Sequence, residues 1–251
     1  MKIEDKQIEK NRYESRAIDQ LKKGNIDNRF NLESFPCYLR KPYEVYENYI
    51  KNLIPKNSKV LEIGSGTGNF TGALIKTGAN VFATDISPAS LEVLKIKFKN
   101  FNNIETHVVD MEKMPFQNES FDFIVSAGCL SYGDHEIVLN EIYRLIKRGG
   151  VFIAIDVLNN NPIYRVKRYL HYLKVDRSLS VIKRTPDFAL LEKYSLKFKV
   201  KINFFGSLTW CMSLLSKIIG AKLTANFSDW FDKKIKVYKS AFRFVMVAIK
   251  N

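Results

Sequence analysis

The sequence predicts an α/β fold built on a parallel sheet with helices on both faces, and three observations lead to this prediction. Apolar runs of about five residues alternate with helical stretches of about ten between residues 44 and 158. Most of these runs consist mainly of apolar residues, as expected for parallel strands buried on both faces. A glycine-rich turn at residues 64–68 joins the first run to the next helix. Alternation of this kind is typical of strand–helix–strand units.

Each element of this core has a local justification. A helix is expected over residues 44–54, because its apolar residues share one helical face. A helix over 88–98 begins with Ser87 as its N-cap and Pro88 in its first turn. A helix is expected over 137–146, and Gly149-Gly150 is the signal that ends it. A further helix is expected at 69–76, and strands are expected at 59–63, 81–83, 104–109, 121–126 and 151–157.

The two ends of the chain differ from this core. Residues 1–34 are polar and predict one or two short helices and a loop, the composition of a lid. Beyond residue 158 the sequence predicts basic helices at 163–173 and 187–194, a strand at 197–205, an amphipathic helix at 208–219 and a last strand at 241–249. The apolar stripe of the 208–219 helix is expected to be core, with contact to lipid as the alternative. The stripe consists of Trp210, Leu214, Leu215, Ile218 and Ile219.

The net charge of +14 is concentrated in the C-terminal third of the chain. Residues 159–251 carry 19 Lys and Arg against 5 Asp and Glu, whereas residues 1–58 have a net charge of +3 and residues 59–158 of −3. A basic segment of this kind favours an anionic partner, which is a phosphorylated small molecule, a nucleic acid or an anionic lipid. A solubilising surface without a partner is the alternative.

The expected compartment is the cytoplasm, with the inner face of the membrane as a second option. The first ten residues, MKIEDKQIEK, lack the apolar stretch of a signal peptide, and no run of about 18 apolar residues indicates a membrane span. Cys37, Cys129 and Cys211 are far apart, so neither a disulfide framework nor a Cys-rich zinc site is expected. No His, Asp or Glu cluster has metal-ligand spacing, and we expect no metal.

The strongest functional motif is the run VLEIGSGTG, from Val60 to Gly68. Glycine lets the backbone turn sharply after a strand and lets a ligand approach main-chain atoms. Asp85 ends the next strand, 21 residues after Gly64, where a carboxylate can accept both hydroxyls of a ribose. Asp110 ends the third strand and suits an adenine amino group. The set predicts a cofactor that contains a nucleoside.

Two such cofactors compete. A dinucleotide site has the spacing GxGxxG and places a pyrophosphate at a helix N-terminus. This chain has GxGxG, and Glu62 stands two residues before the first glycine. An acidic side chain beside the loop would repel a pyrophosphate but suits a ligand with an ammonium or sulfonium group. The residues therefore favour S-adenosylmethionine over a nicotinamide dinucleotide.

These motifs resemble those of the class I S-adenosylmethionine-dependent methyltransferases. The similarity runs through 60–68, Asp85, Asp110-Met111, 121–131 and 139–157, and covers roughly residues 40–157 and the final strand. It implies a Rossmann-like, seven-stranded, mostly parallel sheet whose last strand lies antiparallel beside 151–157. It implies S-adenosylmethionine as cofactor and S-adenosylhomocysteine as product. The implied cofactor contacts are Glu62, Gly64, Ser65, Gly66, Gly68, Asp85, Ile86, Asp110, Met111 and Ala127.

The resemblance divides the chain into four parts. We expect an N-terminal helical cover at 1–43, a cofactor-binding core at 44–158, a basic acceptor-binding insertion with the sixth strand at 159–240, and a strand at 241–251 that completes the sheet.

Methyl transfer to a hydroxyl requires a base that removes its proton. In a parallel sheet the site lies beyond the C-terminal strand ends, and the segment after residue 126 brings Tyr132, Asp134 and His135 there. His135 and His171 are the main candidate bases. Asp134 is a third candidate, although we expect it to cap the helix that follows. Cys129 is expected to be a small buried residue rather than a nucleophile.

The basic insertion is expected to bind the acceptor together with Tyr132. Its candidate contacts are Arg165, Arg168, Arg177 and Arg184, because guanidinium groups suit the oxygens of a diphosphate. A solvated helix face is the alternative. The runs SAGCLSYGD and NPIYRVKRYLHYL also resemble methyltransferases of bacterial surface-polysaccharide loci. That resemblance implies a sugar hydroxyl, on a nucleotide sugar or a lipid-linked glycan, as the acceptor.

Three hypotheses about function follow. The first is O-methylation of a small anionic acceptor such as a nucleotide sugar or glycan precursor. The second is an RNA methyltransferase that uses the basic C-terminal region, although no RNA-binding module is recognised and the fourth motif lacks an Asn/Asp-Pro-Pro-Tyr sequence. The third is a binding protein that holds the cofactor without catalysis. The sequence does not predict the oligomeric state.

Overall fold

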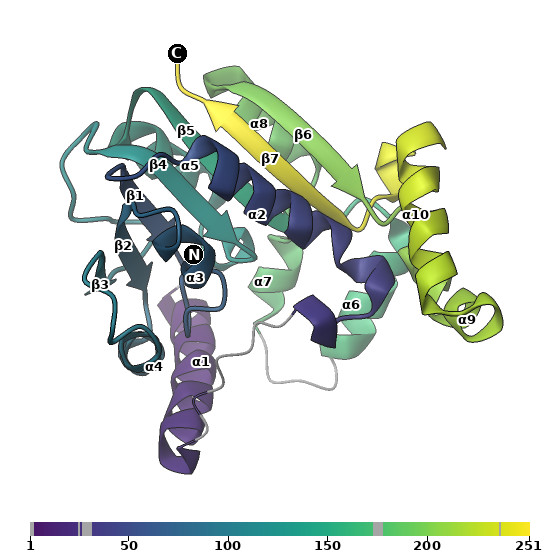
Figure 1. The fold of residues 1–251 in the computed structure, drawn as a ribbon, viewed down its shortest axis with the longest axis horizontal. Helices are drawn as coiled ribbons and strands as arrows, with labels where there is room; N and C mark the ends of the chain where they lie inside the picture. The colour runs from purple at the N-terminus through teal and green to yellow at the C-terminus, as the bar shows by residue number, and fades with distance from the viewer. Residues whose placement is uncertain (1–2, 25, 27–31, 173–177, 236) are drawn as a thin grey trace.

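A computed structural model describes residues 3–24, 26, 32–172, 178–235 and 237–251 of the chain. A seven-stranded sheet crosses the molecule in the order β3-β2-β1-β4-β5-β7-β6 (Figure 1). Its strands are β1 (Lys59–Ile63), β2 (Asn80–Asp85), β3 (Ile104–Val108), β4 (Phe121–Ala127), β5 (Ile146–Val157), β6 (Lys199–Phe205) and β7 (Arg243–Ile249).

Strands β1 to β5 are parallel to one another, with Val60 opposite Val81 of β2 and Phe123 of β4. Strand β7 lies between β5 and β6 and is antiparallel to both. The expected Rossmann-like, mostly parallel sheet with an antiparallel last strand is therefore confirmed. Because β1 to β4 run in one direction, their carboxyl ends meet at one edge of the sheet, which becomes the site.

Helices cover both faces of the sheet. Their bounds are α1 (Ile3–Lys23), α2 (Lys41–Leu53), α3 (Thr71–Ile75), α4 (Pro88–Lys97), α5 (His135–Leu145), α6 (Pro162–Tyr172), α7 (Leu179–Lys183), α8 (Phe188–Lys197), α9 (Thr209–Ile219) and α10 (Ala221–Ile235). Short 3-10 turns lie at η1 (Leu32–Ser34), η2 (Cys37–Leu39), η3 (Leu130–Tyr132) and η4 (Tyr238–Ser240).

The two faces of the sheet have separate cores. One core packs Leu139 of α5 and Tyr194 of α8 against the strands. The other packs Tyr46 and Ile50 of α2 and Leu74 of α3. In Figure 1, α2 lies across one face and α5 and α8 lie behind the sheet. Burial on both faces explains why most residues of the central strands β1, β4 and β5 are apolar.

Several element boundaries differ from the prediction. The helix expected to reach Gly149-Gly150 ends at Leu145, because Ile146 is already extended and begins β5. A Cβ at Gly150 would lie 2.9 Å from the Asp122 carbonyl oxygen, so this glycine permits a close approach to β4 instead of capping a helix. Where one or two short helices were expected over residues 1–34, the described part of this segment holds the long helix α1 and the 3-10 turn η1. Helices α7 and α10 were not expected, and residue 173 lies outside the described residues.

The prediction that the apolar stripe of the 208–219 helix is core is wrong. Trp210 is 43% exposed, Leu214 66% and Ile218 72%, whereas Met212 on the opposite side is buried. Helix α9 packs on α10 rather than on the sheet, and the pair projects from the end of the molecule beside β6 and β7 (Figure 1). Among the described helices, none is both long and apolar enough to cross a bilayer.

The turn between β1 and α3 packs on α4. Gly66 and Gly68 both have positive φ, at 53° and 78°. A Cβ at Gly68 would lie 2.8 Å from Cε2 of Phe98 and 3.0 Å from Cγ of Leu94, whereas a Cβ at Gly66 would have open space. Gly68 is therefore required for packing, and Gly66 leaves main-chain atoms accessible to a ligand.

We predict that Gly68→Ala destabilises the protein more than Gly66→Ala. Both substitutions force alanine into the left-handed region, at a cost of roughly 1–2 kcal/mol. Gly68→Ala adds overpacking against Phe98 and Leu94, typically about 1–3 kcal/mol more. Urea unfolding followed by circular dichroism measures both variants. Equal losses of unfolding free energy would contradict the packing role of Gly68.

Candidate functional site

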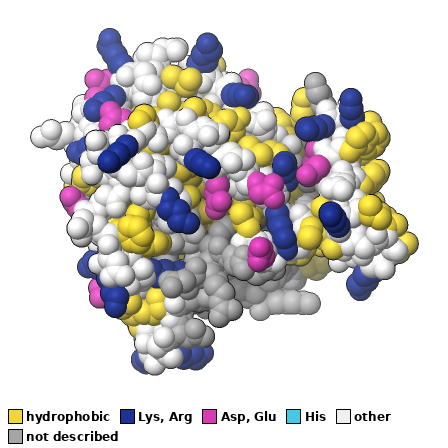
Figure 2. All heavy atoms as spheres, in the orientation of Figure 1, with side chains coloured by type: hydrophobic (Ala, Val, Ile, Leu, Met, Phe, Trp, Pro, Cys, Tyr) yellow, Lys and Arg dark blue, Asp and Glu magenta, His cyan; other side chains and the backbone are white. Residues whose placement is uncertain are grey.

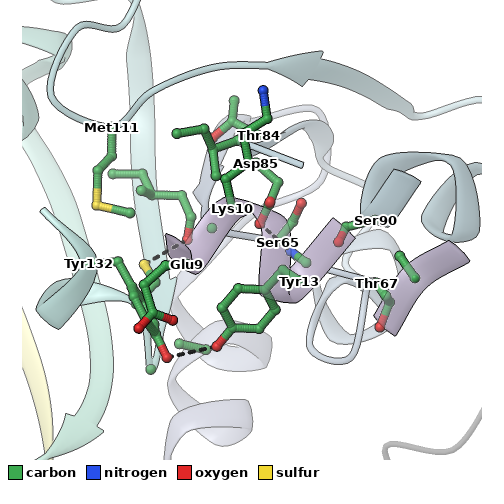
Figure 3. A pocket seen from close by; sticks show the side chains of 18 of the residues that line it. Glu9, Lys10, Tyr13, Ser65, Thr67, Thr84, Asp85, Ser90, Met111 and Tyr132 are labelled. Carbon is green, nitrogen blue, oxygen red and sulfur yellow. Dashed lines mark hydrogen bonds between the residues drawn. The ribbon is translucent and has the colours of Figure 1, made fainter. Parts of the chain in front are cut away.

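A cavity of about 330 Å³ opens at the carboxyl ends of β1, β2 and β4. The glycine turn forms its floor, and side chains of α1 close it from the other side (Figure 3). Eight of the ten predicted cofactor contacts line it, and these are Gly64, Ser65, Gly66, Asp85, Ile86, Asp110, Met111 and Ala127. The sheet topology brings them together because they lie at the carboxyl ends of four parallel strands, β1 to β4.

Asp85 fixes the shape of the cavity floor. One carboxylate oxygen accepts the Gly66 N–H at 2.9 Å and the other accepts the Ser87 N–H at 2.9 Å. Burial raises the pKa of Asp85, and the backbone hydrogen bonds from Ser87 and Gly66 oppose that rise. The same carboxylate therefore joins the turn after β1 to the turn after β2 and lies on the cavity wall.

Glu62 and Gly68, the other two predicted contacts, do not line the cavity. Glu62 is 3% exposed and its carboxylate accepts a hydrogen bond from the Thr71 hydroxyl at 2.7 Å. Burial raises the pKa of Glu62 to about 7, against the opposing hydrogen bond from Thr71. Glu62 thus joins β1 to α3 beneath the turn. It does not line the cavity, so the described geometry gives it no direct contact with a cofactor there. Gly68 packs on α4, as described above.

Helix α1 covers the cavity through polar contacts. The Lys6 ammonium lies 2.5 Å from Asp110 Oδ2 and 2.6 Å from Glu112 Oε2. The hydroxyls of Tyr13 and Tyr132 are 2.7 Å apart, and the Arg12 guanidinium donates to the same Tyr132 hydroxyl at 3.2 Å. Figure 3 shows Tyr13 and Tyr132 pointing toward one another across the cavity. The polar N-terminal segment therefore lies where a lid would lie.

Glu14 extends this closure to α4. Its carboxylate accepts the Ser87 hydroxyl at 2.5 Å, next to the turn that Asp85 holds. Lys6, Glu9, Lys10, Tyr13, Arg16, Ala17 and Gln20 of α1 all line the cavity.

A second cavity, of about 610 Å³, adjoins the first. The two share five lining residues, which are Tyr13, Phe70, Ala127, Gly128 and Tyr132. Its other walls come from β5, α6, α7, α9 and the start of β7. The shared wall places any ligand of the first cavity next to a ligand of the second.

The second cavity contains one buried carboxylate and three cationic side chains. Asp156 is 2% exposed and accepts the backbone N–H groups of Val157 at 2.7 Å and Leu130 at 3.1 Å. Burial raises the pKa of Asp156 to about 6, although these hydrogen bonds and the charges of Arg243 and Arg168 oppose the rise. Lys167, Arg168 and Arg243 line the same cavity.

The cationic side chains differ in the contacts that they make within the protein. Arg168 donates to Asn159 Oδ1 at 2.6 Å and to the Leu158 carbonyl at 3.0 Å, and burial lowers its pKa to about 10. Arg243 lies over the Tyr43 ring at 4.8 Å. Within the described ranges, its buried Nε has no hydrogen-bond partner. A buried donor without a partner is costly, so this atom is suited to an anionic ligand.

The predicted arginine clamp is not assembled. Of the described members, Arg168 lines the second cavity, whereas Arg165 and Arg184 line neither cavity. The Arg184 guanidinium instead donates to the Ser180 hydroxyl at 2.6 Å. Arg177 lies outside the described residues. Tyr132, the remaining predicted acceptor contact, stands on the wall that the cavities share.

The candidate bases differ in their positions and in their hydrogen-bond partners. Asp134 caps α5 by accepting the N–H groups of Glu136 and Ile137, as expected. The His135 Nε2 lies 2.7 Å from the Arg184 carbonyl oxygen and faces neither cavity. His171 is on α6, but its side chain is outside what the structure describes. Cys129 is buried with its thiol pKa raised by burial to about 12, so a small packing residue fits better than a nucleophile.

Sequence reasoning missed Asp156 and Arg243. Both lie in strands whose apolar sequences predict core positions. They share a cavity because β7 pairs with β5, so that Arg243 is opposite Val157. An acidic residue inside the apolar run VFIAIDV was the one available signal, because buried carboxylates are rare without a role.

Part of the chain is similar to known proteins. Residues 61–154, from β1 into β5, match the family model of a methyltransferase domain. A demethylmenaquinone methyltransferase of Chlorobaculum parvum is 37% identical over 123 residues, which are 47% of this chain and 49% of that protein. The chain thus spans about half the length of the curated relatives of that name.

Two solved structures show the same fold. A chain in the complex of the Haloferax volcanii Trm112 methyltransferase activator with a methyltransferase has a TM-score of 0.64 at 16% identity, over 95% of this chain and 97% of that one. Phosphoethanolamine N-methyltransferase 2 of Haemonchus contortus, in complex with S-adenosylmethionine, has a TM-score of 0.56 at 17% identity, over 83% and 52%. Residues 61–154 are therefore similar to a methyltransferase domain, and the chain has the Rossmann-like fold of these two structures.

Proposed function

We propose that the protein is an S-adenosylmethionine-dependent methyltransferase that holds the methyl donor in the first cavity and the acceptor in the second. The observation that carries this proposal is the wall of five residues common to both cavities. Methyl transfer requires the acceptor atom to stand behind the methyl group in line with the bond that breaks. Two adjoining cavities with a shared wall supply that arrangement.

The residues of the first cavity fit the donor. Asp85 would accept the ribose hydroxyls, and Asp110 with Met111 would border the adenine. The open main chain at Gly66 would lie against the ligand, since a Cβ there would meet nothing within 4 Å. The aromatic Tyr13 and Tyr132 stand where a sulfonium would face the second cavity, and aromatic faces attract such cations. When bound, the donor supplies a methyl on sulfonium sulfur and leaves as S-adenosylhomocysteine.

We propose that Asp156 is the base. O-methylation breaks the S–CH3 bond, forms an O–CH3 bond and releases the hydroxyl proton, which a side chain near the acceptor oxygen must take. Asp156 lines the acceptor cavity and is held by two backbone N–H groups, whereas His135 faces away. A pKa of about 6 leaves the carboxylate ready to accept a proton at neutral pH. His171 remains the competing candidate.

The acceptor class that we propose is a small anionic molecule with a hydroxyl, such as a nucleotide sugar or a glycan precursor. The support is the cationic set of Lys167, Arg168 and Arg243, with the unpartnered Nε of Arg243. The anionic group would therefore meet Arg243 and, of the four arginines suggested by the sequence, Arg168.

A second acceptor class has its own support. Aromatic rings of Tyr13, Tyr43, Phe70, Trp210 and Phe242 line the acceptor cavity and suit a flat apolar ring. The relative from Chlorobaculum parvum is named for demethylmenaquinone, which makes that compound the reference acceptor of this class. RNA is the third acceptor to be tested, because the C-terminal third is strongly basic.

We predict that Asp85→Ala weakens binding of S-adenosylhomocysteine. Loss of a charge-assisted hydrogen bond costs about 1.5–3 kcal/mol, which is roughly a 10- to 150-fold higher Kd. Titration calorimetry measures the Kd of wild type and variant. The control is Asp122→Ala, which also removes a carboxylate that accepts a backbone N–H, at 2.8 Å from Lys59, but at the other end of the sheet. Equal affinity in wild type and Asp85→Ala would remove Asp85 from the donor site.

We predict that Asp156→Asn lowers kcat by about 100-fold or more, the usual contribution of a general base, and leaves donor affinity unchanged. Only the carboxylate form accepts a proton, so wild-type kcat/KM should rise as pH increases through about 6, and the variant should lack this rise. Steady-state rates from pH 5 to 8 measure kcat and the pH dependence of kcat/KM. His135→Gln and His171→Gln are the matched variants, and a loss confined to His171→Gln would assign the base to α6 instead.

We predict that Arg243→Gln raises KM for the anionic acceptor by about tenfold, since it removes a contact worth about 1.5 kcal/mol. Radiolabelled methyl transfer should first be screened over nucleotide sugars, glycan precursors, demethylmenaquinone and total RNA. Arg148→Gln, on the exposed start of β5, is the control. Methylation of RNA alone, or transfer to an uncharged acceptor that Arg243→Gln does not affect, would overturn the anionic class.

A further inference from the structure

The largest feature that methyl transfer does not explain is an exposed apolar surface on three basic helices. We call it the basic apolar face, and it is formed by the outer sides of α6, α9 and α10. Its apolar members, each at least 40% exposed, are Ile163, Val166, Tyr169, Leu170, Trp210, Leu214, Ile218, Ile219, Leu223, Phe227, Trp230 and Ile235. Figure 2 shows apolar side chains gathered with Lys and Arg on the end of the molecule that α9 and α10 form.

The exposed residues follow helical spacing. On α9, Trp210, Leu214 and Ile218 recur every four residues, and on α10 Leu223, Phe227 and Trp230 recur at four and three. Residues at these spacings lie on one side of a helix. Each helix therefore presents a continuous apolar stripe to the outside, whereas scattered single residues would need no explanation.

The charge around these stripes is positive. Apart from Arg168, which lines the second cavity, helices α6, α9 and α10 together hold six Lys and Arg against two Asp. One of the two, Asp232, is occupied in accepting the N–H groups of Gly206 at 2.6 Å and Ser207 at 3.1 Å. Lys217, Lys222, Lys233 and Lys234 are exposed next to the stripes. Lysine can extend its ammonium to the headgroups while its chain lies along apolar groups.

The face is continuous with the acceptor cavity. Trp210 and Lys167 belong to its surface and also line that cavity. Two hydrogen bonds join α6 to α9 there, from Lys167 Nζ to the Trp210 carbonyl at 3.4 Å and from the Trp210 N–H to the Tyr164 hydroxyl at 3.1 Å. The face and the cavity therefore share part of their lining.

We propose that the basic apolar face binds the headgroup layer of an anionic phospholipid membrane, with α9 and α10 lying in the plane of the interface. Apolar stripes edged by lysine and carrying two tryptophans are suited to that layer, where indole rings prefer to lie. The net positive charge complements anionic lipid. A second copy of this chain would bring the same lysines together, which like charge disfavours. If the proposed function holds, the acceptor is then taken from the membrane surface.

Vesicle flotation with the full chain and no methyl donor tests this proposal. The protein should float with vesicles of phosphatidylcholine and phosphatidylglycerol and much less with phosphatidylcholine alone, and added salt should reduce the bound fraction. Leu214→Ser with Ile218→Ser should lower the partition coefficient at least tenfold. Leu196→Ser is the matched control, because Leu196 is 82% exposed on α8, away from the face.

Charge is tested separately. Lys217→Glu with Lys222→Glu should also lower binding to the anionic vesicles at least tenfold, and Lys51→Glu, exposed on α2, should not. Equal binding of all variants, or no binding of the wild type, would overturn the proposal. So would a dimer in sedimentation analysis that Leu214→Ser with Ile218→Ser dissociates, since the face would then be a subunit interface. Because no donor is present, a failure here leaves the proposed catalysis standing, and a failure of catalysis leaves this result standing.

Discussion

One carboxylate determines the geometry of the site. Asp85 accepts the N–H of Gly66 from the turn after β1 and the N–H of Ser87 from the turn after β2. These bonds hold the glycine turn open toward the cavity, with Glu62 and Thr71 bracing it from beneath. Since the strands are parallel, the residues that follow β3 and β4 arrive at the same edge. The first cavity, the contacts of α1 that cover it and the adjoining second cavity all depend on this arrangement.

The second feature that organises the molecule is the division of charge. The core is slightly acidic, and the excess of positive charge lies after residue 158. Part of that charge, at Arg168 and Arg243, is turned inward beside Asp156, where it can orient an acceptor. The rest lies outside, around the apolar stripes of α9 and α10. A single basic region can thus serve recognition of an acceptor and binding to a surface that carries it.

Local sequence rules predicted most of the core and little of the acceptor side. Ser87 and Asp134 cap helices as expected, because capping depends on a few neighbouring residues. The pattern of parallel strands predicted where Asp85, Asp110 and Ala127 would meet. By contrast, the pairing of β5 with β7, which brings Arg243 beside Asp156, joins residues that are far apart in the sequence. The stripe on α9 has helical spacing, but periodicity does not tell which layer, if any, the stripe faces.

A crystal structure of the protein with S-adenosylhomocysteine is the most direct measurement of the central claim. The account predicts the ribose against Asp85, the main chain of Gly66 against the ligand, and the sulfur atom at the wall shared with the second cavity, near Tyr13 and Tyr132. A ligand whose sulfur faces away from that wall, a nicotinamide dinucleotide in its place, or an empty cavity at saturating ligand would contradict it.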